Sequence, residues 1–220
     1  MNLPSEIIER IIYFVDSSLY PIIYYLFCDI LDIPSPTSNQ LDKLLYYSAK
    51  NGHEELCRLA KKCGAINFNR MLKGAAKGGY RHLCQLAREW GAYNFDIMIM
   101  YAAQYDHKDL CYLAKSWRAD PEIMLYGAAR GGHEHLCYLA KEWGADGFDA
   151  MLYWAARGGH EHLCYLAKEW GATNFNEMIY SAARGGHEHL CYLAREWGAT
   201  DFNEMFYGAT EKEHEHLYMI

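Results

Sequence analysis

The sequence lacks the features that would mark a membrane, secreted or nucleic-acid-binding protein. Its longest apolar run, Leu19 to Phe27, is too short to cross a bilayer. Glu6 and Glu9 stand where a signal peptide would carry basic residues. The net charge is −7 at pH 7, so no overall basic field attracts nucleic acid. We therefore expect a cytoplasmic protein with no membrane partner.

The residue patterns of common active sites and metal sites are also missing. No Cys-x-x-Cys pair occurs among the 8 cysteines, and there is no phosphate-binding glycine loop, nucleophile–base pair or carboxylate dyad. Hydrophobic residues make up 51% and charged residues 22% of the chain, which is ordinary globular composition. We predict a protein that is not an enzyme and that binds neither a cofactor nor a metal.

What the sequence does contain is a repeat of about 27 residues. The string Gly-His-Glu-His-Leu-Cys-Tyr-Leu-Ala-(Lys/Arg)-Glu-Trp-Gly-Ala occurs three times, beginning at Gly132, Gly159 and Gly186. Six cysteines mark the same period, with spacings of 27, 27, 26, 27 and 27 residues: Cys57, Cys84, Cys111, Cys137, Cys164 and Cys191. Such a period predicts stacked units that share a continuous core.

Each unit is predicted to form two short helices joined by a glycine turn. The first helix, typified by residues 176–184, ends at Gly185-Gly186, and the second runs from near His187 to Gly198. Each helix has one apolar face, whose members are expected in the core: Met178, Ile179, Ala182, Ala183, Leu190, Cys191, Leu193 and Ala194. An Asn or Asp at the start of each first helix is predicted to cap it: Asn69, Asp96, Asp149, Asn176 and Asn203.

The run Ala182-Ala183-Arg184-Gly185-Gly186-His187, followed by Leu190, Leu193, Gly198 and Ala199, resembles the ankyrin repeat. The resemblance implies an all-α solenoid of stacked helix-turn-helix repeats, with seven units over residues 41–220 and the last one truncated. Ankyrin repeats have about 33 residues, so these units are expected to lack the ankyrin hairpin. The sequence is also similar to short-period ankyrin-like proteins of large DNA viruses of protists, which implies the cytoplasm of a host cell.

Residues 1–40 do not follow the repeat and are expected to form a helical segment and a linker. Leu3-Pro4-Ser5-Glu6-Ile7 before an amphipathic stretch is similar to an F-box, although the basic and tryptophan residues that usually follow are absent. The resemblance implies binding to a Skp1-type subunit of a host ubiquitin ligase, through the residues Leu3, Pro4, Ile7, Ile8 and Ile11. The alternative is a helical cap that shields the first repeat from solvent.

Most of the chemically suggestive residues are predicted to be structural because they recur in every unit. The six repeating cysteines are expected to be buried, and the histidine that follows the turn in six of the seven repeats is expected, by resemblance, to brace the turn between repeats. The tryptophan near the end of each second helix is interpreted as cover for a flank exposed by the missing hairpin. The rival interpretation is an aromatic stripe for a partner or for self-association.

The positions that vary between repeats remain for function. In ankyrins this side of the first helix lines the concave face, and here it carries basic and aromatic residues typical of interface hot spots. The predicted partner-binding residues are Tyr101, Gln104, Tyr105, Arg130, Trp154, Arg157 and Arg184. We expect a protein-interaction scaffold for an acidic partner, with a solvated rim and an assembly role as the alternatives.

The third repeat is irregular. It has Tyr105-Asp106 in place of the glycine pair and Arg118 in place of the capping glycine, and Asp120-Pro121 restarts the next helix. A non-glycine residue costs up to about 1 kcal/mol if it must adopt a left-handed backbone. Either a change in stacking or a notch for a partner is expected there.

Overall fold

The computed structural model describes residues 37–201 together with residues 203, 205, 207 and 209. These residues contain twelve α-helices and no strand. The F-box-like residues Leu3, Pro4, Ile7, Ile8 and Ile11 lie outside them, as does the end of the seventh repeat. The helices are α3 (Ser38–Lys50), α4 (Glu54–Lys62), α5 (Phe68–Gly78), α6 (Arg81–Glu89), α7 (Phe95–Gln104), α8 (Lys108–Ser116), α9 (Pro121–Gly131), α10 (Glu134–Glu142), α11 (Phe148–Gly158), α12 (Glu161–Glu169), α13 (Phe175–Gly185) and α14 (Glu188–Glu196).

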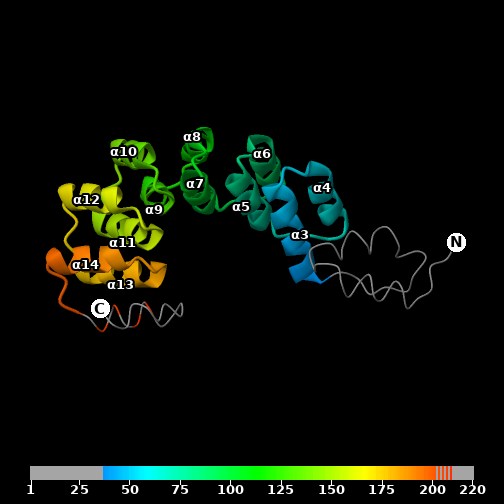
Figure 1. The fold of residues 1–220 in the computed structure, drawn as a ribbon. Coiled ribbons are helices and arrows are strands. Elements are labelled where there is room, and N and C mark those ends of the chain that lie inside the picture. Colours follow the sequence, from blue (N-terminus) through cyan, green and yellow to red (C-terminus); the bar gives the residue numbers. More distant parts are fainter. Residues whose placement is uncertain (1–36, 202, 204, 206, 208, 210–220) are drawn as a thin grey trace, which may run out of the picture. The chain divides into compact units, whose positions relative to one another are not determined.

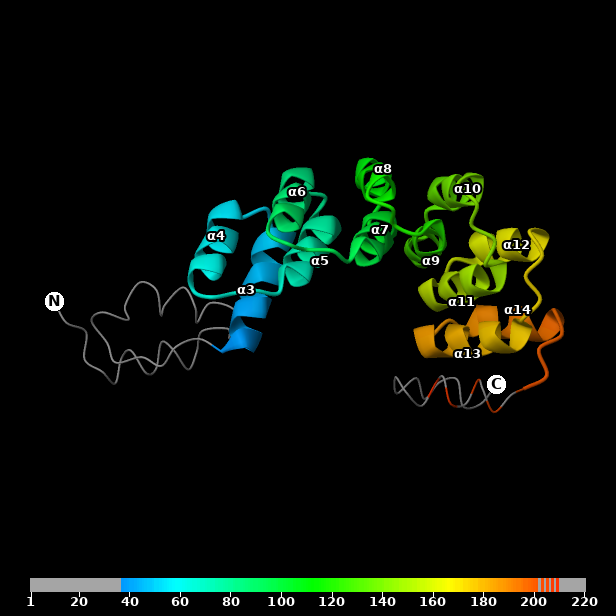
Figure 2. The same cartoon turned by 180° about the vertical axis from the view of Figure 1, so that it is seen from behind.

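The chain divides into two compact units, residues 1–98 and residues 99–220, with the boundary inside α7. In the first unit α3 packs on α4 and on α5, and α5 packs on α6. In the second unit α9, α11 and α13 form one layer, and α10, α12 and α14 form another (Figures 1 and 2). The predicted all-helical architecture is confirmed, and the packing of neighbouring helices is consistent with a helical repeat array.

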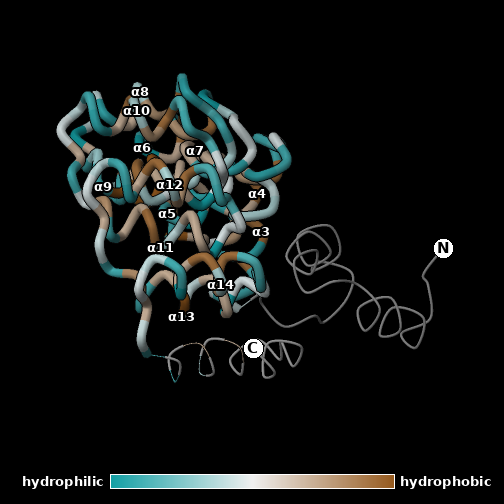
Figure 3. The backbone as a smooth tube through the Cα atoms, turned by 60° about the vertical axis from the view of Figure 1, so that its left-hand side comes forward, coloured by the Kyte–Doolittle hydropathy of each residue, from teal (hydrophilic) through white to brown (hydrophobic). Residues whose placement is uncertain are grey.

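The core consists of the predicted apolar faces. Met178, Ile179, Leu190 and Cys191 are fully buried, as are most of their counterparts in the other described repeats. Figure 3 shows hydrophobic brown segments within the helices, interrupted by hydrophilic teal segments. Burial, reinforced by the Glu161 carboxylate, raises the pKa of the Cys164 thiol to about 12. The cysteine column is therefore core, as predicted, and burial raises the thiol pKa of Cys57, Cys111, Cys137 and Cys191 in the same way.

The predicted capping role of Asn69, Asp149 and Asn176 is wrong. Their helices begin one residue earlier, at a phenylalanine, so these residues lie inside the first turn. Where a side chain does cap a first helix, it belongs to the residue just before the helix: Asn174 Oδ1, for example, accepts a hydrogen bond from the amide of Glu177. The sequence alone does not decide where the helix starts, because Asn and Asp occur on both sides of the phenylalanine.

The misassigned residues instead bind the loop that enters the next repeat. Asp149 Oδ1 accepts hydrogen bonds from the amides of Thr173 at 2.7 Å and Asn174 at 2.9 Å. The same contact recurs along the chain, from Asn69 to the amides of residues 93 and 94, from Glu122 to those of 146 and 147, and from Asn176 to those of 200 and 201. These side chains supply acceptors to loop amides that would otherwise need water. We call them the loop clamps.

The irregular third repeat keeps the backbone of its neighbours without their glycines. Asp106 has φ 60° and Arg118 has φ 71°, and they are the two non-glycine residues with positive φ in the described part of the chain. Gly144, Gly171 and Gly198 occupy the place of Arg118 in later repeats, also with positive φ. Asp106 has a compensating contact, because its carboxylate lies 2.9 Å from His135 Nε2. The predicted left-handed strain is therefore present at both positions.

Removing a loop clamp is expected to loosen the connection to the next repeat. Asp149→Ala deletes the acceptor of two backbone amides and should lower the free energy of unfolding by about 1 kcal/mol, the typical cost of losing an exposed side-chain-to-backbone contact. Asp149→Asn retains Oδ1 and should stay within ~0.5 kcal/mol of wild type. Urea denaturation measures both. Glu169→Ala, an exposed change of equal charge, is the control, and equal losses in all three variants would contradict the clamp.

Arg118→Gly is expected to stabilise the protein by up to about 1 kcal/mol, because glycine adopts positive φ without steric cost. The measurement is the midpoint of urea or thermal unfolding. Gly171→Ala is the reciprocal control: a Cβ there meets no atom within 4 Å, so its loss of stability reports the backbone alone. A lower midpoint for Arg118→Gly would show that the arginine side chain contributes more than its backbone costs.

Candidate functional site

Three first helices of the second unit carry a tyrosine and an arginine four residues apart. The pairs are Tyr126 and Arg130 on α9, Tyr153 and Arg157 on α11, and Tyr180 and Arg184 on α13. Residues at i and i+4 lie on the same side of a helix, so each pair shares one surface. Together with Trp154 of α11, these six residues form what we call the Tyr–Arg face.

Trp154 holds two arginines from neighbouring repeats. The guanidinium carbon of Arg130 lies 5.2 Å from the centre of the indole ring, and that of Arg157 lies 5.3 Å from it. All three side chains are half-buried. Within the described residues neither guanidinium has a carboxylate partner. The ring thus fixes two positive charges whose hydrogen-bond donors are free to bind an anion.

Tyrosine rings extend this contact to the next repeat. The Tyr153 ring lies edge-on to Trp154 at 5.1 Å and stacks with Tyr180 at 6.4 Å and an interplanar angle of 28°. Arg184 Nη1 donates a hydrogen bond of 3.2 Å to the hydroxyl of Tyr180. Side-chain contacts are therefore continuous from α9 through α11 to α13.

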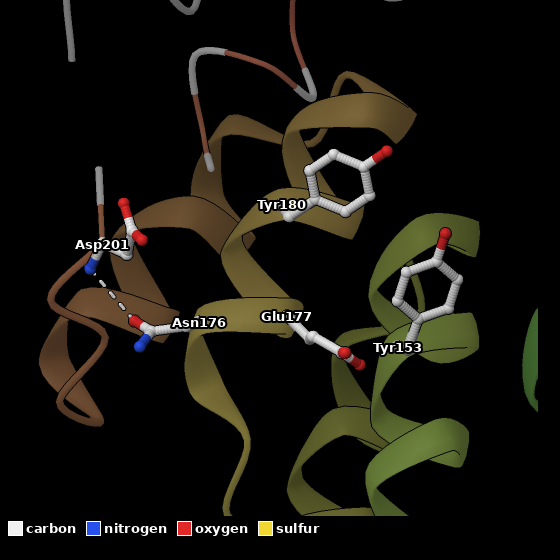
Figure 4. A pocket seen from close by; sticks show the side chains of 5 residues that line it. All are labelled: Tyr153, Asn176, Glu177, Tyr180 and Asp201. Atoms are coloured by element: carbon white, nitrogen blue, oxygen red, sulfur yellow. Dashed lines mark hydrogen bonds between the residues drawn. The ribbon is translucent and has the colours of Figure 1, made fainter. Parts of the chain in front are cut away.

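A shallow pocket of about 310 Å³ opens beside the two stacked tyrosines (Figure 4). It is lined by Tyr153, Asn176, Glu177, Tyr180 and Asp201. Figure 4 shows the two tyrosine hydroxyls pointing the same way and Asn176 bound to the amide of Asp201, at 3.1 Å. The first turns of α9, α11 and α13 each hold one acidic residue and their last turns each hold an arginine, which complements the helix dipole.

Acidic groups at the N-terminal ends also act on the tyrosines. Burial, followed by the charge and hydrogen bond of Glu122, raises the pKa of the Tyr126 phenol. The phenol therefore stays protonated at neutral pH, and its O–H donor is engaged by Glu122. An anionic ligand is favoured at the arginine end of the Tyr–Arg face and repelled from its opposite end.

Histidines fix the helices that carry the arginines. His160 Nε2 lies 3.1 Å from the backbone oxygen of Arg130, and His133 Nε2 lies 3.1 Å from that of Gln104. Because a carbonyl can only accept, Nε2 must carry the proton in both rings. The predicted brace between repeats is confirmed at these two positions. Burial is the main cause that lowers the pKa of His160, against the opposing effect of its bond to Arg130.

The predicted partner-binding residues fall into two groups. Arg130, Trp154 and Arg157 are in direct contact, and Arg184 joins them through Tyr180. Tyr101, Gln104 and Tyr105 lie at the end of α7, one repeat before α9, where Gln104 supplies the carbonyl bound by His133 and Tyr105 is 43% exposed.

Sequence reasoning did not place Tyr126, Tyr153 and Tyr180 in the candidate site, although their i, i+4 spacing from the arginines is visible in the sequence. It also treated the repeat position that Trp154 occupies as one where any residue is tolerated. The structure shows a packing constraint in that column, since a Cβ on Gly127 would come within 2.2 Å of the Met100 backbone oxygen.

The tryptophan column is packed between repeats. Trp170 contacts Phe148 of its own repeat, with ring centres 5.4 Å apart, and Tyr138 of the preceding repeat at 5.1 Å. The Lys141 ammonium nitrogen lies 4.1 Å from its ring centre. These contacts favour the structural interpretation. They leave a row of half-exposed tyrosines on the second helices: Tyr112, Tyr138, Tyr165 and Tyr192.

Two kinds of site are absent from the part of the chain that the structure describes. No three His, Cys, Asp or Glu side chains gather there closely enough to hold a metal ion. None of the helices is long and apolar enough to span a membrane. Comparison of the chain with protein-family models and with curated proteins gives no match.

The lowered pKa of His160 predicts a loss of stability in mild acid. Below its ordinary value of 6.5 the unfolded chain binds a proton that the folded ring resists, so the free energy of unfolding should fall as the pH drops from 7 toward the folded-state pKa. His160→Gln retains an N–H donor and cannot titrate, so its unfolding midpoint should fall less between pH 7 and pH 5. Identical pH dependence in both proteins would assign the effect to other groups.

Proposed function

We propose that the chain is a protein-interaction scaffold in which ankyrin-like, hairpin-less repeats form a solenoid and the Tyr–Arg face binds an acidic protein partner. The observation that carries this proposal is the pair of arginines held on Trp154 without a carboxylate partner among the described residues. A structural role alone would be served equally well by arginines neutralised within the repeat. Positive charge left open beside aromatic rings favours an external anionic partner.

The composition and rigidity of the face suit binding. Arg, Tyr and Trp are the residues most enriched among those that dominate binding energy at protein interfaces. Fixing the Arg130 and Arg157 side chains on one ring removes, before binding, part of the conformational entropy that an interface must otherwise overcome. The half-burial of these groups weakens solvent screening, so each charge–charge contact with a partner is stronger than at an open surface.

The F-box resemblance extends the proposal to a substrate adaptor of a host ubiquitin ligase. Leu3, Pro4 and Ile7 would contact the Skp1-type subunit, and the Tyr–Arg face would select the target. A purified Skp1-type subunit should co-purify with the wild-type chain and not with a variant carrying Leu3→Ala, Pro4→Ala and Ile7→Ala. Absence of binding to the wild-type chain would overturn the adaptor role and leave the scaffold role intact.

The row of half-exposed tyrosines on the second helices favours a second candidate function, assembly into larger particles. Tyr112, Tyr138, Tyr165 and Tyr192 recur once per repeat, and aromatic residues exposed in a row mark interfaces. Assembly predicts that the oligomeric mass rises with protein concentration in light scattering. It also predicts that Tyr138→Ser with Tyr165→Ser abolishes this rise.

The scaffold role is tested by charge reversal on the Tyr–Arg face. A partner recovered by affinity capture should bind Arg130→Glu/Arg157→Glu at least about tenfold more weakly than wild type, a loss of ~1.4 kcal/mol or more. Lys62→Glu/Lys108→Glu makes the same charge change at exposed positions on second helices and should bind as wild type. Equal capture by both double variants, with unchanged thermal melts, would overturn the proposed face.

A further inference from the structure

The arginines of the Tyr–Arg face are spaced by the repeat itself. Arg130, Arg157 and Arg184 occupy the same place on α9, α11 and α13. The axes of packed helices are ~8–10 Å apart, so successive arginines recur at about that distance. The geometry at Trp154 is compatible with this spacing, because guanidinium carbons 5.2 Å and 5.3 Å from one ring centre can be up to their sum apart.

This spacing discriminates between backbone conformations of a bound segment. In a β-strand every second side chain lies on the same side, at intervals of ~6.6 Å. This interval is shorter than the distance between adjacent arginines, and twice this interval is longer than that distance. A polyproline II helix has three residues per turn and a rise of ~3.1 Å, so every third side chain lies on one side at ~9.3 Å intervals. That repeat matches the arginine spacing.

The aromatic residues of the face point to the same conformation. Segments in polyproline II conformation bind grooves lined with aromatic rings, where proline rings pack on flat faces. Tyr153 and Trp154 are nearly perpendicular, with an interplanar angle of 85°, and Tyr180 continues the row beside Tyr153. Three ring surfaces thus lie between and beside the arginines. These rings carry polar groups at their edges, so they do not form the hydrophobic groove that an amphipathic helix requires.

We propose that the Tyr–Arg face binds a polyproline II segment of the partner in which an acidic residue recurs at every third position. The acidic side chains pair with Arg130, Arg157 and Arg184, and the intervening prolines pack on Trp154, Tyr153 and Tyr180. Glu122 and Glu177, in the first turns of α9 and α13, repel the acidic row and fix the side on which it lies. This inference rests on the proposed scaffold function and specifies the partner's chemistry.

The test uses synthetic peptides of identical composition on the full chain. One consists of four Glu-Pro-Pro triplets; the other contains the same four Glu and eight Pro with the glutamates paired. Both are proline-rich and equally charged, so they differ only in the spacing of the acids. Calorimetry is expected to show binding of the triplet peptide at least about tenfold more tightly than binding of the paired peptide. Its lysine counterpart, four Lys-Pro-Pro triplets, is expected not to bind.

Protein variants assign the effect to the face. Arg130→Gln/Arg157→Gln should reduce the affinity for the triplet peptide to that of the paired peptide, whereas Lys62→Gln/Lys108→Gln should leave it unchanged. An α-helical peptide with a glutamate at every seventh residue also presents acidic side chains on one side at a similar spacing. It therefore tests whether the face binds a helix instead. Equal affinity for both proline peptides, no binding of the triplet peptide, or tighter binding of the helical peptide each overturns the inference.

The two proposals fail in different ways. If a captured partner depends on Arg130 and Arg157 while the two proline peptides bind equally, the scaffold function stands and the polyproline II register is wrong. If the captured partner ignores both arginines, the proposed face itself is wrong, whatever the peptides do.

Discussion

The loop clamps are the contacts on which the arrangement of neighbouring repeats depends. A unit of 27 residues has no hairpin to carry the chain from one helix pair to the next, so the amides of the connecting loop need acceptors from elsewhere. Asp149 provides them for Thr173 and Asn174, and its counterparts do the same in other repeats. A single side chain in the first turn of one helix thereby sets where the following helix begins.

The Tyr–Arg face follows from that placement. Because α9, α11 and α13 start at equivalent points, residues at equivalent positions on them face the same way and recur at a constant distance. The histidine braces act at the opposite ends of these helices, where His160 binds the carbonyl of Arg130. Each first helix is thus fixed to its neighbour at both ends. The arginine, tyrosine and tryptophan side chains of the Tyr–Arg face add their own contacts between these helices.

Much of this could be predicted from the sequence, because the repeat reports the same environment several times. The buried cysteines, the apolar faces and the turn histidines recur in copy after copy, and a recurring residue type at helical spacing is a reliable sign of packing. The left-handed conformations of Asp106 and Arg118 were equally predictable, since glycine stands at the matching positions of other repeats.

The clamps and the contact between Arg130 and Trp154 could not be predicted in the same way. A polar residue near a helix start can bond to its own helix or to the next loop, and only the true helix boundary decides between them. Arg130 and Trp154 belong to different columns of different repeats, and Trp154 has no counterpart of its own size in α9 or α13, where Gly127 and Ser181 are buried. Contacts that occur once in an array leave no periodic signal.

The short reach of the loop clamps has a consequence for how such a chain changes over generations. Each clamp joins residues 24 or 25 positions apart. The residues that make this contact between two repeats therefore lie within one repeat and the start of the next. A whole unit can therefore be copied or lost in register, and the remaining neighbours still fit. The three nearly identical strings beginning at Gly132, Gly159 and Gly186 are what recent duplication would leave behind, with Trp154 at a position where the copies have since diverged.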